Sequence, residues 1–434
     1  LNAFVELFAE EARQKAIEIG TKMRAGTAGR LAGLIIGIKD NICFAGHKVT
    51  AGSKILSNYT SVYSSTVVER LIAEDAIVIG RLNCDEFGMG SSNENSFFGP
   101  VKNFADRTRV SGGSSGGSAV AVQANLCHAA LGTDTGGPVR QPAAFCGIVG
   151  FKPTYGRISR YGILAYASSF DQVGTLTRSV EDAALLLEIL AGNDGRDSTA
   201  SPQPVPQYVS ALESDRKRKI ALLKGTFASE SLDAEIREAF GKTVSNLRQQ
   251  GHEVVDLDFE YLEYLVPTYY ILTMAEASSN LSRYDGVHYG YRSPNATNLE
   301  SSYKLSRAEG FGTEVKRRIM LGTFVLSAGY YDAYYAKAQK VRRLIADRVK
   351  AILEEYDFIL LPTAPEPAFP IGREESDPVV KYLADIYTVL ASLAGLPAIS
   401  IPVGLNSNGL PLGVQFVAKP FNESELLAFT NSVK

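Results

Sequence analysis

Residues 110–150 read VSGGSSGGSAVAVQANLCHAALGTDTGGPVRQPAAFCGIVG and hold two glycine-rich turns. The first turn is residues 112–118 (GGSSGGS), and the second is residues 132–138 (GTDTGGP). The apolar, alanine-rich residues between them predict a helix followed by a buried strand. Glycine at this density lets backbone approach backbone or ligand closely. Two adjacent turns that carry backbone N–H groups and serines therefore favour a binding site for an oxyanion.

A lysine stands at the end of a buried strand that the sequence predicts upstream of these turns. Residues 34–38 (LIIGI) are apolar, and Lys39 follows them directly. Most lysines are solvated surface residues, but α/β proteins place their chemistry at strand ends. Burial lowers the pKa of a lysine from ~10.4 toward neutrality, which lets the amine act as a base. We therefore expect Lys39 to belong to a functional site.

Helix and strand patterns alternate along the whole chain, which predicts one α/β domain over residues 1–434 with a mixed central sheet covered by helices on both faces. Strands are predicted at residues 34–38, 76–80, 219–224, 254–257, 358–362, 398–402 and 414–418. Helices are predicted at residues 3–23, with Asn2 as N-cap, and at 65–74, 179–191, 233–250 and 379–393. Residues 261–355 form a helix-rich, tyrosine-rich subregion, and residues 85–99 form a long loop expected over the site.

Composition excludes several classes of protein. The chain has 434 residues and a net charge of −3, so bulk charge gives no reason to expect nucleic-acid binding. Its four cysteines form no CxxC pair and its four histidines show no metal-ligand spacing, which predicts reduced thiols and no metal. We find no signal-peptide pattern and no apolar run that could span a membrane, so a cytoplasmic protein is expected, or an organellar one in a eukaryote.

Two better-known glycine motifs fit the turns poorly. The phosphate-loop pattern G-x-x-x-x-G-K-[ST] is absent, which disfavours a nucleotide site. Residues 112–116 match G-x-S-x-G formally, but no strong strand precedes them and no downstream histidine stands out. A serine hydrolase without histidine needs another base, and a desolvated lysine can serve.

Three segments of the chain resemble the amidase signature family. They are residues 37–41 (GIKDN), 112–118 (GGSSGGS) and 132–147 (GTDTGGPVRQPAAFCG), and the likeness covers nearly the whole chain. Further stretches at residues 85–92, 152–157, 275–281 and 329–335 are similar to the glutaminase subunits of tRNA-dependent amidotransferases. The resemblance implies the amidase-signature fold, an α/β structure.

The resemblance also implies a Ser–cis-Ser–Lys triad. Lys39 matches the family base, and Ser114 matches the serine that relays protons after a cis peptide bond. The backbone of Thr135, Gly136 and Gly137 matches the oxyanion hole.

For glutamine itself, the family uses a tyrosine, an arginine and an aspartate, and Tyr269, Arg318 and Asp385 fall in the matching stretches. Tyr270 is a close rival for Tyr269. An arginine can hold the substrate's α-carboxylate in a two-pronged grip, and an aspartate can hold its α-ammonium group.

One position departs from the family pattern, and it is the nucleophile. The family has a serine where this chain has Pro138. Proline has no hydroxyl, so it cannot form an acyl-enzyme, and it removes one backbone N–H from the turn. Neither Ser115 nor Ser118 stands where the family places the attacking oxygen. We therefore predict that this chain does not hydrolyse glutamine.

Three functions remain open from the sequence. The first is the glutaminase subunit of a heterotrimer with GatB-like and GatC-like subunits, which supplies ammonia for converting Glu-tRNA(Gln) to Gln-tRNA(Gln). That reading implies no cofactor in this chain, with ATP and Mg at the partner subunit. The second is a non-catalytic scaffold subunit of the same complex, with free ammonium as the nitrogen donor. The third is a stand-alone amidase with another amide substrate.

Overall fold

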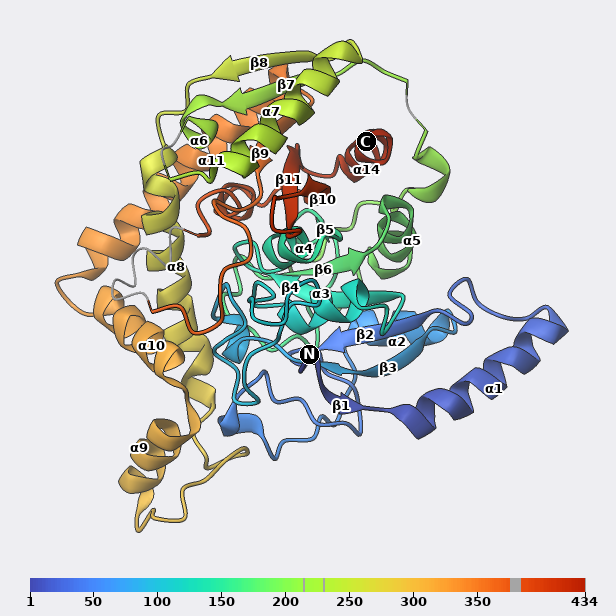
Figure 1. Cartoon of the computed structure of the whole chain (residues 1–434). Coiled ribbons are helices and arrows are strands. Elements are labelled where there is room, and N and C mark those ends of the chain that lie inside the picture. The colour runs from blue at the N-terminus through green and yellow to red at the C-terminus, as the bar shows by residue number, and fades with distance from the viewer. Residues whose placement is uncertain (214, 229–230, 375–383, 434) are drawn as a thin grey trace.

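One mixed sheet runs through the computed structural model, which describes all residues except 214, 229–230, 375–383 and 434 (Figure 1). Among the described residues it has eleven strands in the order β1-β3-β2-β4-β6-β5-β10-β11-β9-β7-β8. The strands are β1 Phe4–Leu7, β2 Ile35–Lys39, β3 Ile77–Leu82, β4 Ala129–Asp134, β5 Val149–Lys152, β6 Gln172–Thr177, β7 Lys219–Leu223, β8 Glu253–Leu257, β9 Phe358–Pro362, β10 Ala398–Leu405 and β11 Pro411–Ala418.

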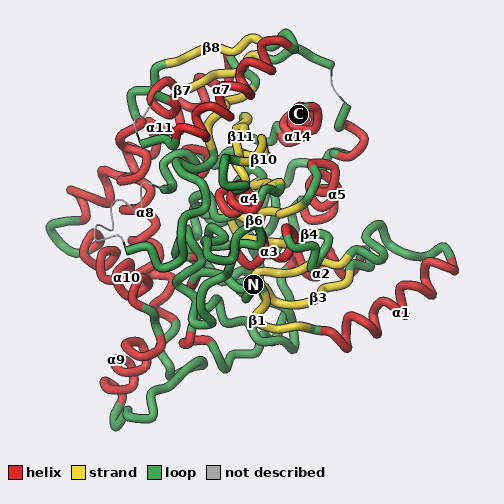
Figure 2. Tube along the Cα trace, in the orientation of Figure 1, coloured by secondary structure: helices red, strands yellow, loops and turns green. Residues whose placement is uncertain are grey.

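Helices pack against both faces of this sheet (Figure 2). The helices are α1 Ala9–Ala25, α2 Thr66–Ala73, α3 Gly116–Gln123, α4 Arg140–Cys146, α5 Val180–Leu190, α6 Lys224–Phe227, α7 Ala234–Gln249, α8 Leu265–Asn280, α9 Leu299–Gly310, α10 Thr313–Leu326, α11 Lys337–Glu355, α13 Val389–Leu393 and α14 Glu423–Ser432. None of these described helices is both long and apolar enough to cross a membrane.

Side-chain alternation along the strands separates two hydrophobic cores. In β9, Phe358 and Leu360 join the core that α2, α5, α7 and α14 cover, whereas Ile359 and Leu361 join the core under α8, α11 and α13. Successive strand residues point to opposite faces, so both faces of a central strand must be apolar. The predicted mixed sheet with helices on both faces is confirmed.

The predicted first helix, residues 3–23, is partly wrong. Phe4–Leu7 is a strand, β1, that pairs antiparallel with β3, and helix α1 begins only at Ala9. Asn2 is no N-cap, because its side-chain amide donates to the carbonyls of Phe98, Gly99 and Pro100. The predicted helix 379–393 is shorter among the described residues, where α13 spans Val389–Leu393, and residues 379–383 lie outside them.

The sheet brings Lys39 and both glycine turns to the side of the sheet where strands β2 and β4 have their carboxyl-terminal ends. Strands β2 and β4 run parallel, so Lys39 at the end of β2 and Asp134 at the end of β4 lie at the same edge. Helix α3 begins within the first turn, at Gly116, and close to the sheet. A Cβ on Gly117 would lie 2.4 Å from the Asn83 carbonyl oxygen, so only glycine permits this approach. The predicted strand ending at Lys39 is confirmed.

Candidate active site

Lys39 lies at the centre of a buried set of hydroxyl groups. Its ammonium nitrogen donates to the side-chain oxygens of Ser114 at 2.7 Å, Ser115 at 2.9 Å and Thr133 at 3.1 Å. Burial lowers the pKa of Lys39 to about 8, although the nearby Cys84 and Asp85 oppose that shift. A fair fraction of the amine is therefore neutral near physiological pH, and a neutral amine can accept a proton from a hydroxyl group.

The first glycine turn carries Ser114 on a cis peptide bond, Gly113–Ser114, as the family resemblance implies. A Cβ on Gly113 would fall 2.1 Å from a carboxylate oxygen of Asp85, so the turn admits only glycine there. The Gly113 N–H donates to the Gln141 side chain at 3.0 Å, and the Asp85 N–H donates to the Ser114 carbonyl at 3.2 Å. These contacts fix the Ser114 hydroxyl beside Lys39.

Asp134 and Arg140 hold the second glycine turn from behind. Both side chains are fully buried, and two guanidinium nitrogens of Arg140 lie 3.0 Å from the Asp134 carboxylate. The Gly137 N–H donates to the same carboxylate at 2.8 Å and is therefore occupied. The backbone N–H groups of Thr135 and Gly136 meet no acceptor in the described part of the chain. Of the three residues matched to the oxyanion hole, these two leave donors for a ligand.

Pro138 closes the second turn without a reactive group. Its carbonyl accepts a hydrogen bond of 3.2 Å from the Ser115 N–H, which ties the second turn to the first. Proline has neither a hydroxyl nor a backbone N–H to offer. The site thus has a buried amine, a relay hydroxyl on Ser114 and two free N–H donors, but no hydroxyl at position 138.

Three further elements bring polar side chains together around Tyr270. Helix α8 carries Tyr269 and Tyr270, helix α10 carries Arg318, and Asp385 precedes α13. The Tyr270 hydroxyl donates to Asp385 at 2.6 Å. Burial raises the pKa of Asp385 to about 6, against the opposing hydrogen bond from Tyr270. The Arg318 guanidinium is 4% exposed and lies 5.3 Å from the centre of the Tyr270 ring.

Tyr269 takes a different place from Tyr270. A Cβ on Gly136 would lie 2.3 Å from the Tyr269 ring carbon that bears the hydroxyl, so this tyrosine packs directly on the oxyanion turn. The Thr388 hydroxyl donates to the Gly136 carbonyl at 2.6 Å and joins the same turn to the segment with Asp385. The oxyanion turn is therefore in contact with Tyr269 directly and with Asp385 through Thr388, whose hydroxyl also lies 3.1 Å from the Asp385 carbonyl oxygen. Arg318 contacts Tyr270 and Tyr166 instead.

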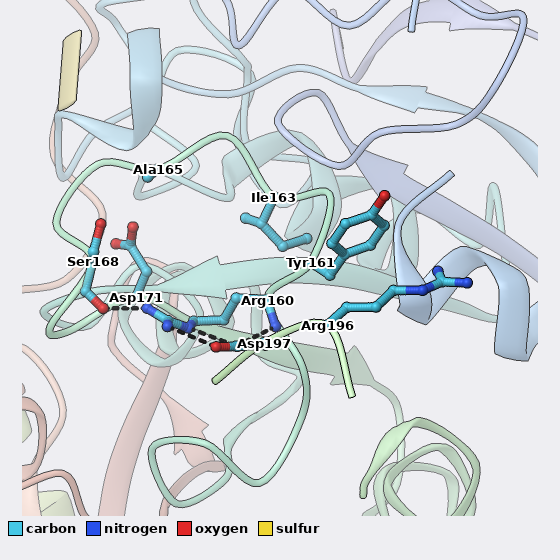
Figure 3. Close-up of a pocket in the computed structure, with 8 residues that line it drawn as sticks. All are labelled: Arg160, Tyr161, Ile163, Ala165, Ser168, Asp171, Arg196 and Asp197. Atoms are coloured by element: carbon cyan, nitrogen blue, oxygen red, sulfur yellow. Dashed lines mark hydrogen bonds and ion pairs between the residues drawn. The ribbon is translucent and has the colours of Figure 1, made fainter. Parts of the chain in front are cut away.

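The sequence motifs assign no role to two buried residues of this region, Asp171 and Tyr166. Asp171 accepts hydrogen bonds from the Thr135 hydroxyl and from two backbone N–H groups, and Tyr166 contacts Arg318. Asp171 also lines a pocket of about 250 Å³ with Arg160, Ser168 and Asp197, shown in Figure 3. The one feature of the sequence that points to Asp171 is its position, a carboxylate directly before a buried strand. Lys39 and Ser114 are not among the residues that line that pocket.

Metal binding has no support in the described part of the chain. No group of three or more histidine, cysteine, aspartate or glutamate side chains is placed there to hold an ion. The four cysteines are buried and unpaired with one another. The donors gathered at the site are an amine, hydroxyls and backbone amides, which suit an organic carbonyl compound better than a metal.

Comparison with known proteins relates the whole chain to one family. The amidase family model matches residues 1–427. The chain is 52% identical, over 436 residues, to the glutamyl-tRNA(Gln) amidotransferase A subunit of Prosthecochloris aestuarii, covering 100% of this chain and 91% of that protein. The crystal structure of the glutamyl-tRNA(Gln) amidotransferase A subunit of Thermotoga maritima matches with a TM-score of 0.80 and 41% identity, covering 96% of this chain and 90% of that one. A crystal structure of an amidase matches with a TM-score of 0.83 and 31% identity, covering 99% and 91%.

Proposed function

The chain belongs to the amidase signature family, and we propose that it is the A subunit of a glutamyl-tRNA(Gln) amidotransferase and that it binds glutamine without hydrolysing it. Two relations support this assignment. Identity to a subunit of that name is 52%, against 31% to the solved amidase. Arg318 and Asp385, which suit the two charged groups of glutamine, also lie on the same tyrosine: the Tyr270 hydroxyl donates to Asp385 at 2.6 Å, and the Arg318 guanidinium lies 5.3 Å from the centre of its ring.

The geometry supports a defined mode of glutamine binding. The carboxamide oxygen would accept hydrogen bonds from the N–H groups of Thr135 and Gly136, whose donors have no partner within the described residues. Arg318 would bind the α-carboxylate, and Asp385 the α-ammonium group. Tyr269 packs on Gly136 and would contact the substrate chain between these two ends.

In the family reaction the first step moves a proton in two stages. The hydroxyl at position 138 would give its proton to Ser114, and Ser114 would give its own to the neutral amine of Lys39. The freed oxygen would attack the carboxamide carbon, and the charge on the carbonyl oxygen would be held by the two N–H groups. Collapse would release ammonia, with the proton returned through Ser114.

Pro138 removes the hydroxyl group with which those reaction steps begin. Lys39 and Ser114 keep their hydrogen bond of 2.7 Å, so the base and relay are present. Residue 138 has no side-chain hydroxyl to attack, and no acyl-enzyme can form there. This single residue carries the proposal that the chain is inactive as a glutaminase.

Because this subunit would not hydrolyse glutamine, its complex would need free ammonium as the nitrogen donor for amidation. With GatB-like and GatC-like partners, ATP and Mg²⁺ at the partner subunit, the complex would amidate Glu-tRNA(Gln) with ammonium as the nitrogen donor. It would act in the cytoplasm, or in an organelle of a eukaryote. The scaffold function and the proposed function thus coincide in this chain.

The nitrogen donor provides the test. The complex is assembled from this chain and its partner subunits, and Gln-tRNA(Gln) is measured with ammonium chloride or with glutamine. We expect product with ammonium and none above background with glutamine. Product formed equally from glutamine would overturn the proposal. If the chain purifies without any partner and hydrolyses other amides, the stand-alone amidase function replaces it.

A further inference from the structure

One buried carboxylate, that of Asp171, contacts the oxyanion turn directly and is linked to Arg318 through Tyr166. Its Oδ1 accepts a hydrogen bond of 2.6 Å from the Thr135 hydroxyl on the oxyanion turn. Its Oδ2 accepts from the backbone N–H groups of Tyr166 at 2.9 Å and Ala167 at 3.0 Å. Asp171 is 4% exposed and directly precedes β6, so the sheet holds its backbone in place.

Tyr166 extends this connection to the arginine. Its hydroxyl accepts a hydrogen bond from an Arg318 guanidinium nitrogen at 3.0 Å and donates to the Thr273 hydroxyl at 3.0 Å. The ring is 3% exposed, so it cannot shift without repacking its neighbours. The same carboxylate therefore sets the position of Thr135 and the backbone position of Tyr166. Tyr166 orients Arg318 together with Glu314, whose carboxylate accepts from the Arg318 Nε–H group at 2.8 Å.

We propose that Asp171 is a positioning residue that fixes the distance between the oxyanion turn and the carboxylate-binding arginine. The inference rests on the proposed function, because it takes glutamine as the ligand that spans these two points. Glutamine has its carboxamide and its α-carboxylate at opposite ends of a short chain. Both ends can be bound together only if the two protein groups keep one separation.

Asp171 borders the pocket of Figure 3, so the fold should tolerate a conservative substitution there. Asp171 lines that pocket together with Ser168 and Arg160, so its side chain is not enclosed by apolar atoms on every side. Asparagine has the same shape as aspartate. Its amide oxygen can accept from the Tyr166 and Ala167 N–H groups. Its NH₂ group can only donate to the Thr135 hydroxyl oxygen, which replaces a hydrogen bond to a charged carboxylate with a weaker neutral one. Asp171→Asn should therefore fold while loosening the connection.

The kinetics of glutamine hydrolysis test the inference in the Pro138→Ser background, with the partner subunits present. Asp171→Asn should lower kcat and raise KM for glutamine, each by ~10-fold, because both ends of the substrate lose their fixed spacing. Thr135→Val should lower kcat chiefly, and Thr135→Ser should restore it. Tyr166→Phe should raise KM chiefly, because Arg318 loses a hydrogen-bond acceptor.

Asp75→Asn is the matched control. Asp75 is a buried carboxylate, 2% exposed, that accepts hydrogen bonds from Lys22 and from the Gly29 N–H group. It precedes β3, which runs parallel to β2, and so lies at the end of these strands that is remote from Lys39. It should leave both constants within ~2-fold of the background.

The inference is overturned if folded Asp171→Asn changes only one constant, or neither. If that variant fails to fold, Thr135→Val, Thr135→Ser and Tyr166→Phe provide the test. An unchanged KM in Tyr166→Phe then rejects the proposed link from Asp171 through Tyr166 to Arg318. Absence of glutamine hydrolysis in Pro138→Ser itself, with Asp171 intact, would instead count against the proposed function.

Discussion

The side-chain nitrogen of Lys39 donates a hydrogen bond of 2.7 Å to the hydroxyl of Ser114, and both groups are buried where β2 ends. This pair is the base and relay of the proposed site. Its environment sets when it can work, because burial lowers the pKa of Lys39 to about 8. Only the neutral amine can accept a proton from Ser114.

Replacing Pro138 with serine should therefore restore glutamine hydrolysis with a characteristic pH dependence. We expect an increase of ~10³-fold or more over the unmodified chain, measured as glutamate released by the complete complex. Below pH 8 most of the amine is protonated and therefore inactive as a base. kcat/KM should therefore rise with pH, approaching tenfold per unit, and level off above about 8.

A further substitution in the same revertant assigns that rise to the amine. Lys39→Arg keeps the positive charge but stays protonated at every accessible pH, so activity should fall by ~10²–10⁴-fold. Full activity in that variant, or a profile that falls between pH 6 and 8, would contradict the role of Lys39 as base.

Glutamine binding by the unmodified chain should weaken in acid. Burial raises the pKa of Asp385 to about 6 despite the hydrogen bond from Tyr270, so the carboxylate becomes neutral below that pH. A neutral acid holds the α-ammonium group poorly, and the Kd from calorimetry should rise as pH falls through 6. Asp385→Asn should raise Kd by ~10–100-fold at pH 7.5.

Tyr270 and a truncated ligand separate this effect from other titrating groups. Tyr270→Phe removes a hydrogen bond that lowers the pKa of Asp385, so the acid transition should move to higher pH. The monoamide of glutaric acid has no ammonium group, and Asp385→Asn should not weaken its binding. Equal losses for both ligands would show that Asp385 does not bind the ammonium group.

A methyl group at Gly136 should damage the site without unfolding the chain. A Cβ there would lie 2.3 Å from the Tyr269 ring, so Gly136→Ala must displace that tyrosine from the oxyanion turn. We expect the glutamine Kd to rise by ~10-fold or more, by calorimetry. Gly241→Ala is the control, since nothing lies within 4 Å of its Cβ position on α7. It should leave binding unchanged and stabilise the helix by ~0.5–1 kcal/mol.

The sequence predicts local features of this site well and remote contacts poorly. Lys39, Ser114 and the two turns stand in continuous motifs, and the strand before Lys39 follows from a short apolar run. The contact of Asp171 with Thr135 joins residues 36 positions apart, and that of Tyr270 with Asp385 joins residues 115 apart. No periodicity or spacing in one sequence encodes such pairs, because the tertiary fold brings them together.

The N-terminal segment shows the same limit in the fold. Residues 3–23 carry an apolar stripe at helical spacing, which predicts one helix throughout. Phe4 and Leu7 instead pair with Leu82 and Gly80 of β3, and the backbone hydrogen bonds of that sheet edge decide the local structure. Local propensity yields here to a partner far along the chain.

The buried ion pair behind the oxyanion turn should dominate the stability of the site. Arg140 contacts Asp134 at 3.0 Å and also donates to Gln415 and to the Thr388 carbonyl, all without exposure to water. Asp134→Asn leaves a buried guanidinium without its counter-charge. We expect the free energy of unfolding to drop by ~3–5 kcal/mol, measured by urea denaturation.

The pH dependence and a double substitution test that interpretation. Burial alone would raise the pKa of Asp134, but Arg140, together with Lys152 and the Val139 N–H group, holds that pKa below the ordinary value of 3.8. The pair's contribution is therefore full above pH 3.8 and is lost as pH falls further, a loss that Asp134→Asn should abolish. Asp134→Leu with Arg140→Met removes both charges, so it should cost less than Asp134→Asn alone. If the double variant is the less stable of the two, hydrogen bonds from Arg140 to its other partners, rather than the ion pair, hold the turn.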